Sequence, residues 1–145
     1  MSLLTTTPTA RQLDTGLAIL RIAVGLVFIA HGGQKLFQFG FAGVTGAFGQ
    51  MGIPLPGITG PLVAIVEFLG GILLVVGLFT RIAAFLLAVN MLGAMLFVHL
   101  SAGFFLPAGV EFALTLFLAN IAILVMGPGA LSLDHSIYRR RATVP

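Results

Sequence analysis

The stretch His31-Gly32-Gly33-Gln34-Lys35 decides the fold, because it ends a long apolar run that begins near Leu17. A helix needs about twenty apolar residues to cross the hydrocarbon layer of a membrane. An ionisable side chain at the edge of such a run is costly in hydrocarbon, so it needs a partner, contact with water or a functional role. The sequence therefore predicts a membrane helix that carries polar side chains near one end.

The composition also indicates an integral membrane protein. Apolar residues make up 59% of the 145 residues and charged residues 8%, and the mean hydropathy is +1.15. So few charged residues cannot cover a water-soluble domain of this size. The net charge of +3 comes from basic residues that lie where membrane topology places them, so nucleic acid is not an expected partner. The expected surroundings are the lipid bilayer.

The absence of cysteine limits the chemistry of the chain. It excludes disulfide exchange, thiolate metal ligands and covalent c-type haem attachment within this chain. Any redox chemistry must therefore come from a bound cofactor or a neighbouring protein, and we expect no metal site. A haem held between His31 and His99 is an alternative, but it requires matched geometry and a large cleft.

Four apolar runs are long enough to span the membrane as helices. We place them near residues 15–38, 60–79, 81–101 and 108–127. They predict an all-α membrane protein with four transmembrane helices in an antiparallel bundle of two hairpins. An uncharged outer loop follows the first helix, and we expect it to lie in the membrane interface or to fold over the bundle.

The basic residues predict the orientation of these helices. Arg11 and Arg21 lie near the start, Arg81 lies in the turn between the second and third runs, and Arg139–Arg141 lie at the end. Because basic loops stay on the cytoplasmic side, both termini are predicted to be cytoplasmic. By default, Arg21 and Arg81 are interfacial anchors that reach the lipid headgroups. We divide the chain into a cytoplasmic tail (1–14), a four-helix transmembrane domain (15–138) and a basic cytoplasmic tail (139–145).

Polar side chains from all four runs are predicted to converge near the outer end of the bundle. They are His31, Gln34 and Lys35 of the first run, Glu67 of the second, His99 of the third and Glu111 of the fourth. A helical projection places Asn90 opposite His99 and Asn120 opposite Glu111. We therefore leave both asparagines outside this cluster.

Two interpretations of the cluster stand side by side. Lys35, Glu67 and Glu111 could form internal ion pairs that only fix the register of the helices. Interhelical polar contacts in membranes contribute only about 0.6–2 kcal/mol, so stability alone is a weak reason to keep ionised groups there. A functional pocket, which can include the same pairs, is the sharper hypothesis.

The order and spacing of several short motifs resemble the DoxX family. They are His31-Gly32 with Lys35, Gly52-Ile53-Pro54, Glu67-Phe68-Leu69-Gly70-Gly71, Gly77-Leu78-Phe79-Thr80-Arg81, His99, Gly109 with Glu111, and Gly127-Pro128-Gly129 with Ser132-Leu133-Asp134. The resemblance covers about residues 15–138. It implies a four-helix bacterial membrane protein linked to membrane redox and thiol-related metabolism. Members include DoxD subunits of thiosulfate:quinone oxidoreductase, DoxX proteins associated with a mycobacterial membrane redox complex, and MauE-like maturation proteins. The family offers no settled set of catalytic residues.

Our leading hypothesis is a subunit of an oxidoreductase assembly in the bacterial inner membrane, with a quinone-sized cleft near the outer leaflet. The histidines would donate or relay protons, the lysine would stabilise a developing oxyanion, and the glutamates would hold the lysine and pass protons onward. The candidate catalytic residues are His31, Lys35, Glu67, His99 and Glu111. The candidate quinone-binding residues are His31, Gln34, Lys35, Glu67 and His99. The chain would depend on a redox partner protein, and a homo-oligomer is also considered.

The sequence is also compatible with two other functions. A non-enzymatic scaffold or maturation factor for a redox partner would use the polar cluster only for helix packing or docking. It predicts that His31 and His99 tolerate alanine while Gly70 and Gly71 do not tolerate bulk. A small-solute transporter is the third possibility, although four helices are few for a carrier unless the protein oligomerises. The sequence leaves open whether the chain is itself an enzyme.

Overall fold

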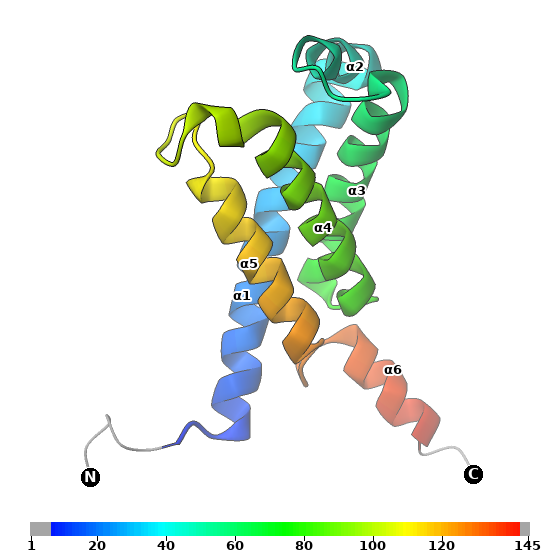
Figure 1. The fold of residues 1–145 in the computed structure, drawn as a ribbon. Coiled ribbons are helices and arrows are strands. Elements are labelled where there is room, and N and C mark those ends of the chain that lie inside the picture. The colour runs from blue at the N-terminus through cyan, green and yellow to red at the C-terminus, as the bar shows by residue number, and fades with distance from the viewer. Residues whose placement is uncertain (1–6, 143–145) are drawn as a thin grey trace.

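The computed structural model describes residues 7–142, and the regular structure in this part of the chain is entirely helical (Figure 1). The prediction of an all-α fold is confirmed. The elements in chain order are α1 (Ala10–Gly33), the π-helical turn η1 (Gln34–Phe39), α2 (Gly40–Gln50), α3 (Pro56–Val76), α4 (Thr80–Ala94), the π-helical turn η2 (Met95–His99), the 3-10 turn η3 (Leu100–Ala102), α5 (Glu111–Met126) and α6 (Leu133–Ala142).

Three helical stretches within the described residues are long and apolar enough to cross a membrane, namely Ala10–Gln50, Pro56–Val76 and Thr80–Ala102. A further apolar helix, α5, has 16 residues and is shorter than the run that the sequence predicts. It begins late because residues 103–110 form a turn instead of helix. In this turn the backbone N–H of Val110 donates to the carbonyl of Gly103 at 2.9 Å.

The first helix begins earlier than the sequence predicts. Thr9 and Gln12 form a capping box, in which each side chain binds the backbone N–H of the other residue. This arrangement satisfies N–H groups that a helix start leaves unpaired. Helix α1 therefore begins at Ala10, inside the segment 1–14 that we predicted to be a tail.

The uncharged segment after the first run is a helix where we predicted a loop. The chain turns at Gly40, which has a φ of +64° that favours glycine, and continues as α2. Val44 of α2 is 2% exposed and packs on Gly60 of α3. The glycine content of α2 disfavours a helix, but this burial against α3 offsets the weak preference.

The helices pack mainly in two pairs, α1 with α3 and α4 with α5. In Figure 1 the two pairs diverge toward the end of the molecule that carries α2. We call this end the cleft end. Small residues bring α1 and α3 together, because a Cβ atom at Gly71 would lie 2.7 Å from both the carbonyl oxygen of Gly25 and the backbone nitrogen of Ile29. Close backbone approach at glycine is a common way to join membrane helices.

The opposite end carries the start of α1, the α3–α4 turn and α6, and we call it the basic end (Figure 1). Arg21 is 1% exposed and donates to the carbonyl oxygens of Pro128 at 3.3 Å and Leu131 at 2.7 Å. The prediction that Arg21 reaches the lipid headgroups is therefore wrong. Its guanidinium is turned inward because the carbonyls after α5 give it acceptors inside the protein.

Two aspartates complete the contacts of this end. Asp134 accepts from the backbone N–H of Phe79 at 2.8 Å and of Thr80 at 2.9 Å, which caps the start of α4. Asp14 accepts from the backbone N–H of Ala130 at 2.9 Å. The segment between α5 and α6 is thus bound to α1, and the start of α6 is bound to the α3–α4 turn.

Candidate functional site

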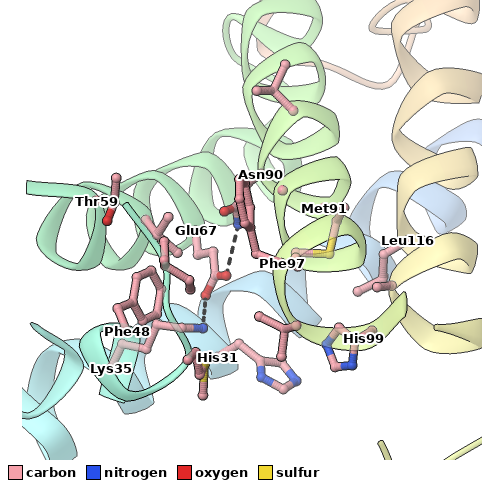
Figure 2. A pocket seen from close by; sticks show the side chains of 18 of the residues that line it. His31, Lys35, Phe48, Thr59, Glu67, Asn90, Met91, Phe97, His99 and Leu116 are labelled. Carbon is pink, nitrogen blue, oxygen red and sulfur yellow. Dashed lines mark hydrogen bonds and ion pairs between the residues drawn. The ribbon is translucent and has the colours of Figure 1, made fainter. Parts of the chain in front are cut away.

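The centre of the site is a carboxylate that receives a hydrogen bond on each oxygen. Lys35 Nζ lies 2.5 Å from Glu67 Oε2, and Asn90 Nδ2 donates to Glu67 Oε1 at 2.9 Å. Figure 2 shows the lysine and the asparagine reaching the glutamate from different sides. The Glu67 side chain is 5% exposed and that of Lys35 is 21% exposed. The buried carboxylate is thus paired and hydrogen-bonded on both oxygens, as a low-dielectric environment requires.

The glycines of the opening motif explain why the lysine reaches the glutamate. A Cβ atom at Gly32 would clash with the backbone nitrogen of Phe68, the residue after Glu67. Only a residue without a side chain lets α1 approach α3 this closely. Lys35 follows one turn later, in η1, and so lies beside Glu67.

A cavity of about 410 Å³ lies beside this ion pair (Figure 2). Its polar lining consists of His31, Lys35, Thr59, Glu67, Asn90 and His99. Its other walls are apolar or small and come from α1, α2 and the turn after it, α3, α4, η2 and α5. They are Phe28, Phe48, Met51, Ile53, Val63, Val89, Met91, Gly93, Ala94, Phe97, Val98, Phe112, Ala113 and Leu116.

The two histidines lie on the cavity wall and come from different elements, His31 from α1 and His99 from η2. The ring of His31 faces that of Phe112, with centroids 6.1 Å apart and planes tilted by 44°. His99 Nδ1 lies 2.7 Å from the carbonyl oxygen of Ala108. Because a carbonyl only accepts, Nδ1 carries the hydrogen and Nε2 of the neutral ring is left as an acceptor.

Two predicted site residues do not join this group. Gln34 is exposed and does not line the cavity, because it lies one position before Lys35 and so points to another side of the helix. Glu111 Oε1 accepts from the backbone N–H of Leu106 at 2.7 Å. Its carboxylate therefore supports the turn before α5, and of the two glutamates proposed to hold Lys35 it is Glu67 that does so.

Asn90 is the site residue that the helical projection missed. The projection assumes a straight α-helix from Asn90 to His99, but η2 occupies Met95–His99. A π-helical turn rotates less per residue than an α-helix, so Asn90 and His99 both line the cavity. The sequence signal for Asn90 was a polar amide within an apolar helix. Such a group needs a partner, which favours placing it in the polar cluster.

The described residues contain no arrangement of acidic and histidine side chains typical of a metal site. Between residues 7 and 142 there is no group of three or more such side chains placed to hold a metal ion. The site can instead offer hydrogen-bond donors. Lys35 has three N–H groups and Asn90 has two, and each uses one on Glu67.

The fold and the site define an α-helical membrane protein with a polar cluster in an otherwise apolar cavity. The chain belongs to the DoxX family, whose model matches residues 16–100. A second family model, described as TQO small subunit DoxD, matches residues 59–144. The resemblance drawn from the sequence motifs is thereby confirmed.

Several relatives match nearly the whole chain. It is 38% identical over 128 residues to an uncharacterized protein of Haemophilus influenzae, covering 86% of this chain and 92% of the relative. It is 34% identical over 129 residues to the Bacillus subtilis protein named "Putative oxidoreductase CatD", covering 89% and 92%. It is 33% identical over 139 residues to the inner membrane protein YphA of Escherichia coli, covering 88% and 98%. No solved structure matches the chain. These relatives and the apolar helices identify a bacterial membrane protein.

Proposed function

We propose that the chain is a membrane subunit of an oxidoreductase assembly and that its cavity binds the ring of a quinone. The observation that carries the proposal is the Lys35–Glu67–Asn90 cluster at the wall of an apolar cavity of about 410 Å³. Cavities of about 300–1,000 Å³ with apolar walls and a few polar groups are typical small-molecule sites. The matches to a DoxD small subunit and to an oxidoreductase-named relative support the same class.

The residues of the cavity suit a flat apolar ring with carbonyl oxygens. The second and third N–H groups of Lys35, and the second of Asn90, would bind a carbonyl oxygen while Glu67 holds both side chains in place. His99 Nε2 would accept or return a proton at the wall. A bound quinone would supply two-electron, two-proton redox chemistry. A partner protein would supply the electrons.

The proposal includes the position of the cavity in the membrane. We place four spans across the bilayer, with both termini cytoplasmic and the cleft end in the outer leaflet of the bacterial inner membrane. The excess of arginine at the basic end supports this orientation. Helix α5 would reach about 24 Å at 1.5 Å per residue, and the turns at its ends would complete the crossing of about 30 Å.

The test is quinone binding by the purified full-length protein in mild detergent, with decylubiquinone as the probe and calorimetry as the readout. We expect saturable binding that weakens about tenfold or more in the double variant Lys35→Met/Glu67→Gln, because a charge-assisted hydrogen bond of about 1.5–3 kcal/mol is lost. Gln34→Ala is the matched control and retains binding. Folded protein without saturable binding, or equal binding by the double variant, would overturn the quinone site and favour a scaffold.

A further inference from the structure

A second cavity, of about 650 Å³, lies at the basic end and has no part in the cleft. It is formed by the α3–α4 turn, the first residues of α4, Pro128 and one face of α6. The α6 residues are Asp134, His135 and Tyr138, and Tyr138 lies beside the other two because it follows them by four and three positions. The basic residue in its wall is Arg81.

We propose that this cavity binds the phosphate headgroup of an anionic phospholipid. Every polar side chain that faces it, except Asp134, can donate a hydrogen bond. The one acidic side chain in its wall, Asp134, is engaged with two backbone N–H groups of the α3–α4 turn. The imidazole of His135 and the hydroxyl of Tyr138 have no hydrogen-bond partner within residues 7–142. A phosphate presents several acceptor oxygens and a negative charge, so it complements this set.

The position of Arg81 supports an anionic ligand. The residue is exposed, and its single hydrogen bond in the described chain is a long one of 3.5 Å from Nη2 to the carbonyl oxygen of Val125. A Cβ atom at Gly127 would lie 2.9 Å from Nη2, so the glycine leaves room for the guanidinium beside the end of α5. A guanidinium has five N–H groups, and four of them remain for phosphate oxygens.

The depth of the cavity favours a lipid over a free anion. Arg81 is the second residue of an apolar helix that begins at Thr80, so it lies where hydrocarbon gives way to headgroups. Phe79 and Ile82 line the same cavity and are each 59% exposed. They would contact the acyl chains while Arg81 holds the phosphate. Arginines also outnumber aspartates at this end, and juxtamembrane basic segments attract anionic lipids.

The test uses full-length protein in neutral detergent and counts bound lipid by native mass spectrometry. Phosphatidylglycerol and phosphatidylcholine with identical acyl chains are the probes. We expect retention of phosphatidylglycerol, reduced about fivefold by Arg81→Gln because one arginine near the surface contributes about 1 kcal/mol. Tyr138→Phe changes only an exposed hydroxyl, and we expect a decrease of about threefold. Arg11→Gln removes the same charge at an exposed position outside the cavity and retains the lipid.

Three outcomes would overturn the proposal. Equal retention of phosphatidylcholine would remove the role of the anionic headgroup. An equal loss in Arg11→Gln and Arg81→Gln would indicate general attraction by the basic end. Thermal protection by inorganic phosphate as strong as that by phosphatidylglycerol would indicate a free-anion site. The variant Lys35→Met/Glu67→Gln should keep the lipid, so a failed quinone site leaves this result unaffected.

Discussion

At the scale of single residues, the contact between Lys35 and Glu67 determines what the cleft can do. Both are ionisable residues within apolar helical stretches, where an unpaired charge is costly. Their pairing joins η1 to α3, and Asn90 extends the join to α4. Removing one member of a buried pair is costly because the other charge is left without a partner, whereas removing both is much less so.

This asymmetry predicts the behaviour of two variants. Glu67→Gln should lower the free energy of unfolding by about 3 kcal/mol, because it leaves the Lys35 ammonium beside a neutral amide. The double variant Lys35→Met/Glu67→Gln should recover part of this loss. Thermal unfolding in detergent measures both, with the exposed Gln34→Ala as the unchanged control. A double variant less stable than Glu67→Gln would contradict this account of the pair.

Cleft residues were predictable where depth in the membrane alone determines whether a side chain lies at the level of the cleft. Placing His31, Lys35, Glu67 and His99 at one level required only the length of each apolar run. Asn90 required the rotation of a helix, which the π-helical turn η2 alters. Glu111 required the fold of the turn before α5, which its carboxylate binds. Neither feature follows from helical periodicity.

At the scale of elements, glycine sets the spacing between α1 and α3. The carbonyl oxygens of Gly25 and Gly71 each occupy the space that a Cβ atom of the other residue would need. Gly70 faces α4 instead, where an added Cβ atom would meet the side chain of Leu87 at 3.1–3.2 Å. Gly71 thus faces a rigid backbone, whereas its neighbour Gly70 faces a movable side chain.

Alanine substitutions should separate these two environments. Gly71→Ala should destabilise the protein by about 1–3 kcal/mol, because the helices must move apart to admit a methyl group. Gly70→Ala should cost less, since Leu87 can change its rotamer. Gly16→Ala is the control, because open space surrounds Gly16 and alanine favours the helix. Melting temperatures in one detergent rank the three, and equal losses at both sites would refute the backbone contact.

At the scale of the whole molecule, the two ends of the bundle differ in construction. The cleft end is open between the two helix pairs and has a cavity. The basic end is bound together by side chains that hold backbone groups, with Arg21 on two carbonyls and Asp134 on two N–H groups. We infer that the contacts of the basic end support the fold, while the cleft end is the part where a ligand enters between the helix pairs.

Loss of the Asp134 carboxylate should loosen the basic end as one unit. Asp134→Ala removes the cap of α4 and should cost about 1 kcal/mol. Hydrogen exchange should rise together at residues 77–82 and 127–134, because the same side chain joins both segments. Exchange around Glu67 should stay unchanged, as should all exchange in the control Arg11→Gln. A rise confined to α6 would show that the two segments are not coupled.

The helical class was predictable because long apolar runs favour membrane helices, but the number of long helices was not, since three described stretches and not four are long enough to cross a membrane. The all-α class and the polar level near the cleft end follow from these runs. The inward turn of Arg21 does not, because its acceptors lie more than a hundred positions away in sequence. The α2 helix also depends on distant packing, since Val44 is buried on α3.

The π-helical turn η2 makes the arrangement of the cleft tolerant of a change in chain length. A π-helical turn accommodates one residue more than the α-helical turn it replaces. An in-frame deletion of one codon within residues 95–98 would restore α-helical geometry and keep Asn90 and His99 near one face, because eight α-helical steps leave them about 80° apart. The turn therefore absorbs one residue of chain length, and a relative that loses this residue would keep the constellation.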